Sequence, residues 1–193
     1  MSSRLEQIID SYDASAALDH AATIPSSWYT NQELYDLELK TVFTHSWHFA
    51  ARRDQLAEPG RFVTADIACE PIVVVRGNDQ IIRGFYNVCR HHAAAVMTEL
   101  EGQAAQLRCP YHGWTYSLAG ELKGTPDFAG VCSFEKEANG LVPLALSEWE
   151  NWIFVKLETN GLSLPEFLGA DLVAQMEPLK LDGLHWQERR HQL

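Results

Sequence analysis

Long hydrophobic runs are absent from this sequence of 193 residues. No apolar stretch reaches the roughly 18 to 20 residues of a membrane-spanning helix. Basic residues are also scarce: 15 Lys and Arg face 26 Asp and Glu, and the formal net charge is −11. This balance argues against nucleic acid or an anionic membrane as a partner, because both are bound by clusters of Lys and Arg. The first residues lack a basic region followed by an apolar one, so we expect no secretory signal and a cytoplasmic location.

Cysteine is sparse as well, with four in the chain. We expect no disulfides, because the cytosol keeps thiols reduced. Cys69 and Cys132 stand among apolar or small residues, which predicts that both are small buried side chains. Cys89 and Cys109 each have a histidine close by, and this points to metal binding.

Helices are expected near both ends of the chain. Residues 1–30 are polar and irregular, whereas apolar spacing over residues 30–47 predicts a short helix with Thr30 or Asn31 as its N-cap. Apolar residues recur at helical intervals over residues 163–179 and predict a second helix.

The region between these helices predicts a mainly β protein. Val- and Ile-rich runs alternate with turn residues from residue 60 to residue 158, which indicates six to nine short antiparallel strands. The runs are interrupted at Glu70–Pro71 and at Gly77–Asp79, and the second interruption is typical of a hairpin turn.

Two mixed pairs of potential metal ligands lie within this β region. Cys89-x-His91 and Cys109-x-x-His112 are separated by the 17 residues 92–108. Each pair follows a strand-like run and precedes a turn of small residues, so two loops can meet at their tips. Together they offer two thiolates and two imidazoles.

Two kinds of metal centre fit these donors. Structural zinc accepts two cysteines and two histidines, but zinc fingers usually take both cysteines from one element and both histidines from another. A Rieske [2Fe–2S] cluster has two thiolates on one iron and two imidazoles on the other, so each loop must supply one ligand of each type. The mixed pairs favour the Rieske cluster. A coincidental grouping of buried thiols and histidines is the remaining alternative.

The loop sequences also resemble a known family. Cys89-Arg90-His91 and Cys109-Pro110-Tyr111-His112-Gly113-Trp114 are similar to the cluster loops of the Rieske non-haem iron oxygenases, which include ring-hydroxylating dioxygenases and choline-monooxygenase-like enzymes. The likeness covers roughly residues 28–160 and includes the stretches FTHSWHFAARRDQLAEPGRFVTADIACEPIVVVRG and LVPLALSEWENWIFVKLE. His92 is a departure, since the family more often has Arg at this position.

The resemblance implies a fold, a set of domains and a cofactor. Residues 46–160 would form a Rieske-type antiparallel β domain, with a small cluster-binding subdomain at about 86–120. Residues 1–45 would be an N-terminal extension with a helix, and residues 161–193 a helix and linker toward a catalytic domain outside this chain. The cluster ligands would be Cys89, His91, Cys109 and His112. The residues beside them would be Arg90, His92, Tyr111, Gly113 and Trp114.

Similarity to other Rieske proteins also predicts the reduction potential. The Rieske proteins of respiratory cytochrome complexes brace their loops with a disulfide and donate a Ser hydroxyl to the cluster. Ala94 and Tyr111 stand at the positions of those cysteines, and Trp114 stands at the position of the Ser. Fewer donors stabilise the reduced cluster less, so we expect a potential at the low end of the range, on the order of −150 mV to 0 mV. The free imidazole edges of His91 and His112 are expected to face solvent.

A second metal site is missing. Oxygenases of this family also bind a mononuclear Fe(II) through two His and one carboxylate. The nearest pattern here, Asp182-x-x-His185 followed by His191, has the wrong spacing and no later Asp. We therefore interpret the chain as the N-terminal part of an oxygenase, with no catalytic residues of its own and with electron transfer as its role.

The expected partners follow from this interpretation. An NAD(P)H-dependent reductase or a ferredoxin would supply electrons near His91 and His112, where Arg90, Arg108 and Lys123 provide positive charge. A trimer is expected only for a full-length enzyme, which would act on a quaternary ammonium compound or an aromatic acid. Two alternatives remain, namely a free-standing Rieske ferredoxin and a zinc module that mediates protein interactions.

Overall fold

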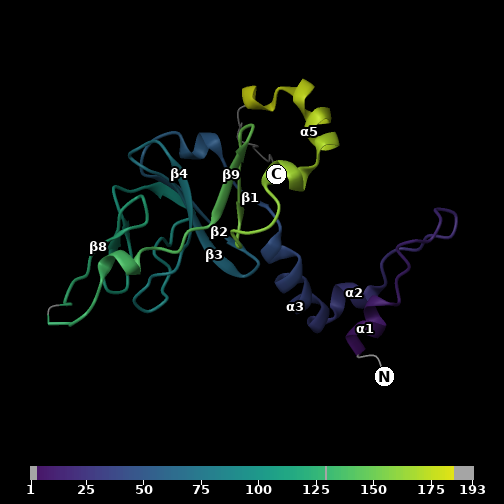
Figure 1. Ribbon diagram of the computed structural model, residues 1–193, viewed down its shortest axis with the longest axis horizontal. Helices are drawn as coiled ribbons and strands as arrows, with labels where there is room; N and C mark the ends of the chain where they lie inside the picture. Colours follow the sequence, from purple (N-terminus) through teal and green to yellow (C-terminus); the bar gives the residue numbers. More distant parts are fainter. Residues whose placement is uncertain (1–3, 129, 185–193) are drawn as a thin grey trace, which may run out of the picture. The chain divides into compact units, whose positions relative to one another are not determined.

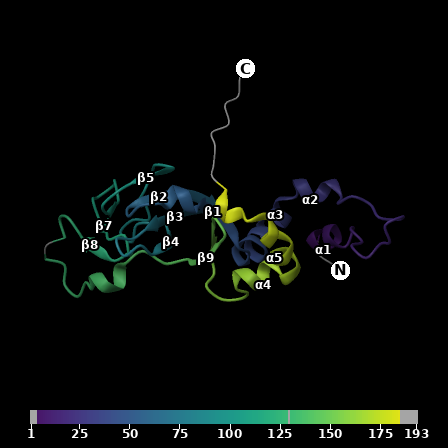
Figure 2. The same cartoon turned by 90° about the horizontal axis from the view of Figure 1, so that it is seen from above.

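The computed structural model describes residues 4–128 and 130–184, which fall into two compact units. The first unit is Met1–His45 and the second is Ser46–Leu193. Figures 1 and 2 show the chain from two directions.

The first unit is helical. Its elements are α1 (Arg4–Ile9), α2 (Ser26–Thr30), α3 (Gln32–Thr41) and the short 3-10 helix η1 (Phe43–His45). Asn31 caps α3, since its side-chain oxygen accepts a hydrogen bond from the N–H of Leu34 at 2.8 Å, and this confirms the predicted start of the helix. The prediction of irregular structure over residues 1–30 is wrong, because α1 and α2 lie there. They are joined by the Trp28 indole, which donates to the carbonyl of Ile8 at 2.9 Å.

The second unit contains ten strands within the described residues, arranged in three antiparallel sheets. The first sheet has the order β1-β10-β9, with β1 (His48–Arg52), β9 (Ala145–Trp149) and β10 (Trp152–Lys156). The second has the order β4-β3-β2-β5, with β2 (Arg61–Ile67), β3 (Glu70–Arg76), β4 (Ile82–Tyr86) and β5 (Glu101–Gln103). The third has the order β6-β7-β8, with β6 (Leu107–Arg108), β7 (Thr115–Tyr116) and β8 (Leu122–Gly124). The predicted antiparallel β fold is confirmed.

The strand β3 explains how these sheets pack. Its apolar run alternates between two cores, so that Val73 and Val75 enter the first core while Ile72 and Val74 enter the second. All four side chains are fully buried, which accounts for the unbroken hydrophobic run in the sequence. The first core lies between the second and third sheets, and the second core lies between the first and second sheets.

The sequence predicted a turn at each end of β3, and only one of the two is found at the expected residues. The hairpin at Gly77–Asp79 is confirmed, since the N–H of Gly77 donates to the carbonyl of Ile81 at 2.9 Å. The break expected at Glu70–Pro71 is wrong, because both residues belong to β3. The turn lies instead at Ala68 and Cys69, which have φ angles of 50° and 67°.

Cys69 and Cys132 were expected to be buried, and both are exposed. Cys69 is exposed because it occupies the tight turn between β2 and β3, and Cys132 is exposed in the loop after β8. Local apolar neighbours in the sequence therefore did not indicate burial at a turn or in a long loop.

The segment after β10 forms two short helices instead of one. These are α4 (Leu164–Leu168) and α5 (Ala170–Met176), and Gly169 between them has a φ of 80° that interrupts the helix. Ser163 and Glu166 form a capping box at the start of α4. Both views place α4 and α5 at the end of the second unit that is opposite the third sheet (Figures 1 and 2). No helix in the described part of the chain has the length and apolar character needed to cross a bilayer.

Candidate metal centre

Two loops at the edge of the first core have the same pattern of backbone hydrogen bonds. Cys89 follows β4 and donates its N–H to the carbonyl of Ala94 at 2.8 Å, while the N–H of Ala93 donates to the carbonyl of Cys89 at 3.0 Å. In the second loop, the N–H of Cys109 donates to the carbonyl of Trp114 at 2.8 Å, and the N–H of Gly113 donates to the carbonyl of Cys109 at 3.0 Å. Each cysteine thus starts a turn of the same shape.

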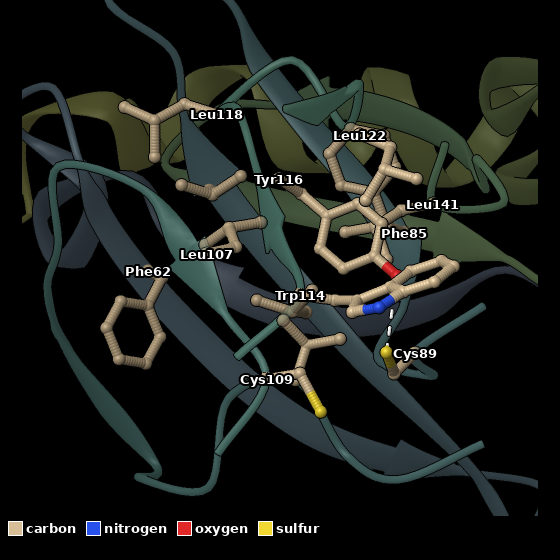
Figure 3. Close-up of a cluster of buried hydrophobic side chains, with 13 residues drawn as sticks. Phe62, Phe85, Cys89, Leu107, Cys109, Trp114, Tyr116, Leu118, Leu122 and Leu141 are labelled. Carbon is tan, nitrogen blue, oxygen red and sulfur yellow. Dashed lines mark hydrogen bonds between the residues drawn. The ribbon is translucent and has the colours of Figure 1, made fainter. Parts of the chain in front are cut away.

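The two cysteines lie together in the first core. Their exposed fractions are 3% for Cys89 and 2% for Cys109, and neither is in a disulfide. Figure 3 draws both at one border of the core, beside Trp114 and Tyr116. Burial raises the pKa of the Cys109 thiol, and hydrogen bonds from the backbone N–H groups of Tyr111 and His112 oppose this by favouring the thiolate. The Cys89 thiol nearby raises the pKa of Cys109 further.

Tyr116 lies against the Cys89 thiol, with its hydroxyl oxygen 3.3 Å from Sγ (Figure 3). The same oxygen accepts a hydrogen bond from the backbone N–H of Arg90 at 3.0 Å. The phenol can therefore accept from Arg90 and donate its own proton to the Cys89 sulfur at the same time. Burial raises the pKa of Tyr116, which keeps the phenol protonated and able to donate.

Three imidazoles gather at the tips of the loops. The ligand nitrogens of His91, His92 and His112 all lie within 4.8 Å of one another, and this group does not include either cysteine. The donors are therefore sorted by type, with sulfur atoms in the core and nitrogen atoms at the loop tips. One tetrahedral ion bound by two cysteines and two histidines would need all four donor atoms around a single point. The arrangement favours a centre with two distinct ends.

The backbone pattern of the loops does not show whether His91 or His92 is the metal ligand. His92 stands three residues after Cys89, as His112 stands three residues after Cys109. His91 is half-buried and its Nδ1 atom is buried with no hydrogen-bond partner among the described residues, whereas His92 is exposed. A buried nitrogen with no partner is ready to bind a metal. Partial burial, together with His92 and His112, lowers the pKa of His91 and so favours the neutral imidazole that metals require.

Comparison with known proteins identifies the domain that carries these loops. Residues 46–135 match the family model described as the Rieske [2Fe-2S] domain. The carnitine monooxygenase oxygenase subunit of Escherichia coli K12 is 36% identical over 149 residues, which are 77% of this chain and 40% of the relative. The chloroplastic choline monooxygenase of Arabidopsis thaliana is 33% identical over 180 residues, which are 88% of this chain and 42% of the relative.

Solved structures give the same result. Naphthalene 1,2-dioxygenase from Rhodococcus sp. superposes with a TM-score of 0.81 and 30% identity, over 91% of this chain and 40% of that one. A quaternary ammonium Rieske monooxygenase superposes with a TM-score of 0.77 and 30% identity, over 84% of this chain and 48% of that one. The chain belongs to the Rieske non-haem iron oxygenase family. It spans about two fifths of the length of the curated relatives it matches.

The residues of this Rieske domain fit its [2Fe–2S] cluster. Cys89 and Cys109 are buried neighbouring thiols, and His91 offers a buried Nδ1 atom that no other described residue binds. His112 lies 4.8 Å from His91 between ring centroids. The sequence-predicted ligands are thus brought together as one thiol pair and one imidazole pair.

The two imidazole rings differ in their exposure to solvent. His112 is exposed and stacks on Tyr111 with 3.8 Å between ring centroids. His91 is half-buried because its ring lies parallel to that of Trp114, at 4.6 Å, with the edge of Phe128 at 6.4 Å. The more open side of the Rieske site is therefore formed by His112, Tyr111 and His92.

Positive charge beside the site comes from two of the three predicted residues. The side chains of Arg90 and Arg108 are exposed, and neither forms an ion pair with a described residue. Lys123 instead pairs with Glu121 at 2.8 Å. The predicted neighbour Gly113 has a φ of 76°, and a Cβ atom there would lie 3.4 Å from the guanidinium of Arg108.

Sequence reasoning missed Tyr116, Phe128 and Phe134 as neighbours of the Rieske site. Tyr116 had one available signal, since it follows Trp114 by two residues and strand alternation places both on one face. The two phenylalanines come from the loop after β8, and nothing in their local sequence indicates where that loop folds. His185 and His191 of the tail pattern lie outside the described residues.

Proposed function

We propose that this chain is the electron-transfer part of a Rieske oxygenase that acts on a quaternary ammonium compound. The observation that carries the proposal is the sorting of four donors into a buried thiol pair and an imidazole pair. When bound, the cluster supplies one-electron transfer. Cys89 and Cys109 would hold one iron, and His91 and His112 would hold the other.

The surroundings of these ligands support a role in electron transfer. Tyr116 lies against the Cys89 sulfur, while Trp114 and Phe128 cover His91, so the first core encloses this part of the site. Tyr111 and His112 form an open edge on the other side, where a redox partner can approach. The chain thus encloses one end of the site and leaves the other end accessible.

Catalysis would take place outside this chain. We infer that residues 46–160 are the Rieske domain, that 86–120 form its cluster-binding part, and that 161–193 lead toward a catalytic domain with a mononuclear iron. The relatives support this division, since each extends well beyond the length that matches. The names of several relatives (carnitine, glycine betaine and choline monooxygenases) support a trimethylammonium substrate.

A separate reductase or ferredoxin would supply the electrons. Several relatives are named oxygenase subunits, which implies a second component in those systems. We propose that the donor approaches the exposed side formed by His92, Tyr111 and His112. The guanidinium groups of Arg90 and Arg108 would attract an acidic donor to this side of an otherwise acidic chain.

Metal analysis of the purified protein tests the proposal. We expect two iron atoms and two acid-labile sulfides per chain, together with the absorption and the electron paramagnetic resonance (EPR) spectrum of a Rieske cluster after reduction. One zinc atom in a colourless protein would reject the cluster. The oxygenase assignment is tested by extending the reading frame beyond Leu193: about two hundred further residues with a two-His, one-carboxylate set support it. A stop codon there in the natural gene would favour a free-standing carrier.

A further inference from the structure

A second buried nitrogen without a partner lies beside His91. The Nε1 atom of Trp114 has no hydrogen-bond partner among the described residues, although the side chain is only 2% exposed. An indole N–H is a donor only, and burying it without an acceptor is unfavourable. An acceptor for this proton is therefore expected in the intact protein.

Water is a poor candidate for that acceptor, because aromatic rings enclose the indole. Phe128 meets it edge-on with ring centroids 5.4 Å apart, and Phe134 meets it at 5.6 Å. The ring of His91 covers a face of the indole at 4.6 Å. An ordered water needs two to four polar partners, and these neighbours offer few.

The cysteine sulfur atoms are not the acceptors either. Cys89 and Cys109 belong to the same core as Trp114, yet the indole N–H makes no hydrogen bond to either Sγ atom. The two orphaned nitrogens, His91 Nδ1 and Trp114 Nε1, belong to rings that lie parallel within 2°. Both are buried at the proposed site, and one of them is the proposed iron ligand. The missing acceptor is then an atom that the described residues do not provide.

We propose that the Trp114 indole N–H donates a hydrogen bond to an inorganic sulfide of the bound Rieske cluster. This inference rests on the proposed function, since it requires the cluster. A donor to the sulfide stabilises the reduced, more negative cluster and raises its reduction potential. Trp114 would thereby supply the hydrogen bond that a Ser hydroxyl supplies in the respiratory Rieske proteins. The replacement of Ser by Trp would then not reduce the number of donors to the cluster.

The substitution Trp114→Phe tests this in the cluster-loaded protein, because it removes the N–H and keeps an aromatic ring in the core. We expect the equilibrium constant for reduction to fall by about tenfold, which for one electron is a decrease of about 59 mV in midpoint potential. The control Trp152→Phe makes the same chemical change on β10 and should leave the potential unchanged. An unchanged potential in a loaded, folded Trp114→Phe protein would overturn the proposal.

A packing effect is separated by Phe128→Leu, which alters the ring contact with Trp114 but retains the indole N–H. The decrease in potential should be clearly smaller for this variant than for Trp114→Phe. If the two decreases are equal, packing explains the effect and the hydrogen bond does not exist.

A measurement on the unaltered protein decides the matter even if Trp114→Phe fails to load the cluster. The protein is labelled with ¹⁵N at the indole nitrogen of tryptophan, and the reduced cluster is studied by pulsed EPR. The proposal requires a weak ¹⁵N coupling that unlabelled protein lacks, and an intact Rieske spectrum without this coupling would contradict it. Absence of any cluster in the unaltered protein would instead refute the proposed function, so the two failures are distinguishable.

Discussion

Ala93 and Gly113 occupy the same position in the two ligand loops, and both have a left-handed backbone, with φ angles of 56° and 76°. Each donates its N–H to the carbonyl of the cysteine four residues earlier at 3.0 Å. The two loops are therefore copies of one turn, although the sequence places glycine in only one of them. The spacing of the histidines differs between the loops, but the backbone that carries them does not.

This equivalence predicts that Ala93→Gly stabilises the protein. A residue with a side chain is strained in the left-handed region and glycine is not, so we expect a gain of about 1 kcal/mol in the free energy of unfolding. The control Ala94→Gly changes a neighbouring residue without positive φ and should destabilise the protein by about 0.5–1 kcal/mol. Denaturant unfolding of both variants measures the difference, and a loss of stability for Ala93→Gly would contradict the prediction.

Substitution of His91 and of His92 should show which of the two histidines binds iron. His91→Ala should prevent cluster loading, because it removes a proposed iron ligand with a buried Nδ1 atom. His92→Ala should retain two irons and two sulfides, since the exposed ring is not required as a ligand. Iron content and the EPR spectrum of each purified variant check this. The ligand assignment fails if His92→Ala, and not His91→Ala, loses the cluster.

Tyr116→Phe is expected to lower the reduction potential. The phenol hydroxyl lies 3.3 Å from the Cys89 sulfur, and its loss removes a donor that stabilises the reduced state. A neutral hydrogen bond contributes about 0.5–1.5 kcal/mol, which corresponds to a decrease of roughly 20 to 60 mV for one electron. Tyr111→Phe serves as the control, because its exposed ring makes no hydrogen bond to the cysteine. A potential that stays the same in Tyr116→Phe would show that the hydroxyl does not donate to the sulfur.

The hairpin between β3 and β4 predicts a pH-dependent contribution to stability. Hydrogen bonds from Arg83 lower the pKa of Asp79 to about 2, below the value of about 3.9 expected in the unfolded chain. The ionised carboxylate therefore stabilises the native state above about pH 4, and this contribution is lost as the pH falls through 2.

Asp79→Asn should accordingly lower the urea midpoint at pH 7, and the difference from the unaltered protein should shrink between about pH 4 and pH 2. A double-mutant cycle with Arg83→Gln assigns the effect to the pair, whose closest contact is 2.7 Å. A difference that is independent of pH would point to a role of Asp79 other than this ion pair.

Much of the fold was predictable because local rules govern it. The Val- and Ile-rich runs, the Gly77–Asp79 turn and the Asn31 cap each depend on residues that are close in sequence, and all are found in the structure. Cys89 and Cys109 were recognised from spacing alone. Their convergence could be predicted because two mixed pairs imply a centre shared between loops.

Other features depend on contacts between distant segments. Phe128 approaches His91 only because the loop after β8 folds back over the site, and no local pattern records this. His92 has the same chemistry as His91, and only the difference in burial separates them. The turn at Cys69 was displaced by two residues from the expected break because Pro71 is tolerated within β3. The positions of Phe128 and His91 thus depend on tertiary packing that the local sequence does not record.

The double-sided burial of β3 has a consequence for how this protein loses its structure. Removing the packing on one face of that strand exposes Val73 and Val75, and the opposite face, with Ile72 and Val74, then lacks a rigid support. The sheets on either side should therefore melt together in one cooperative transition, and limited proteolysis should not release either as a stable fragment.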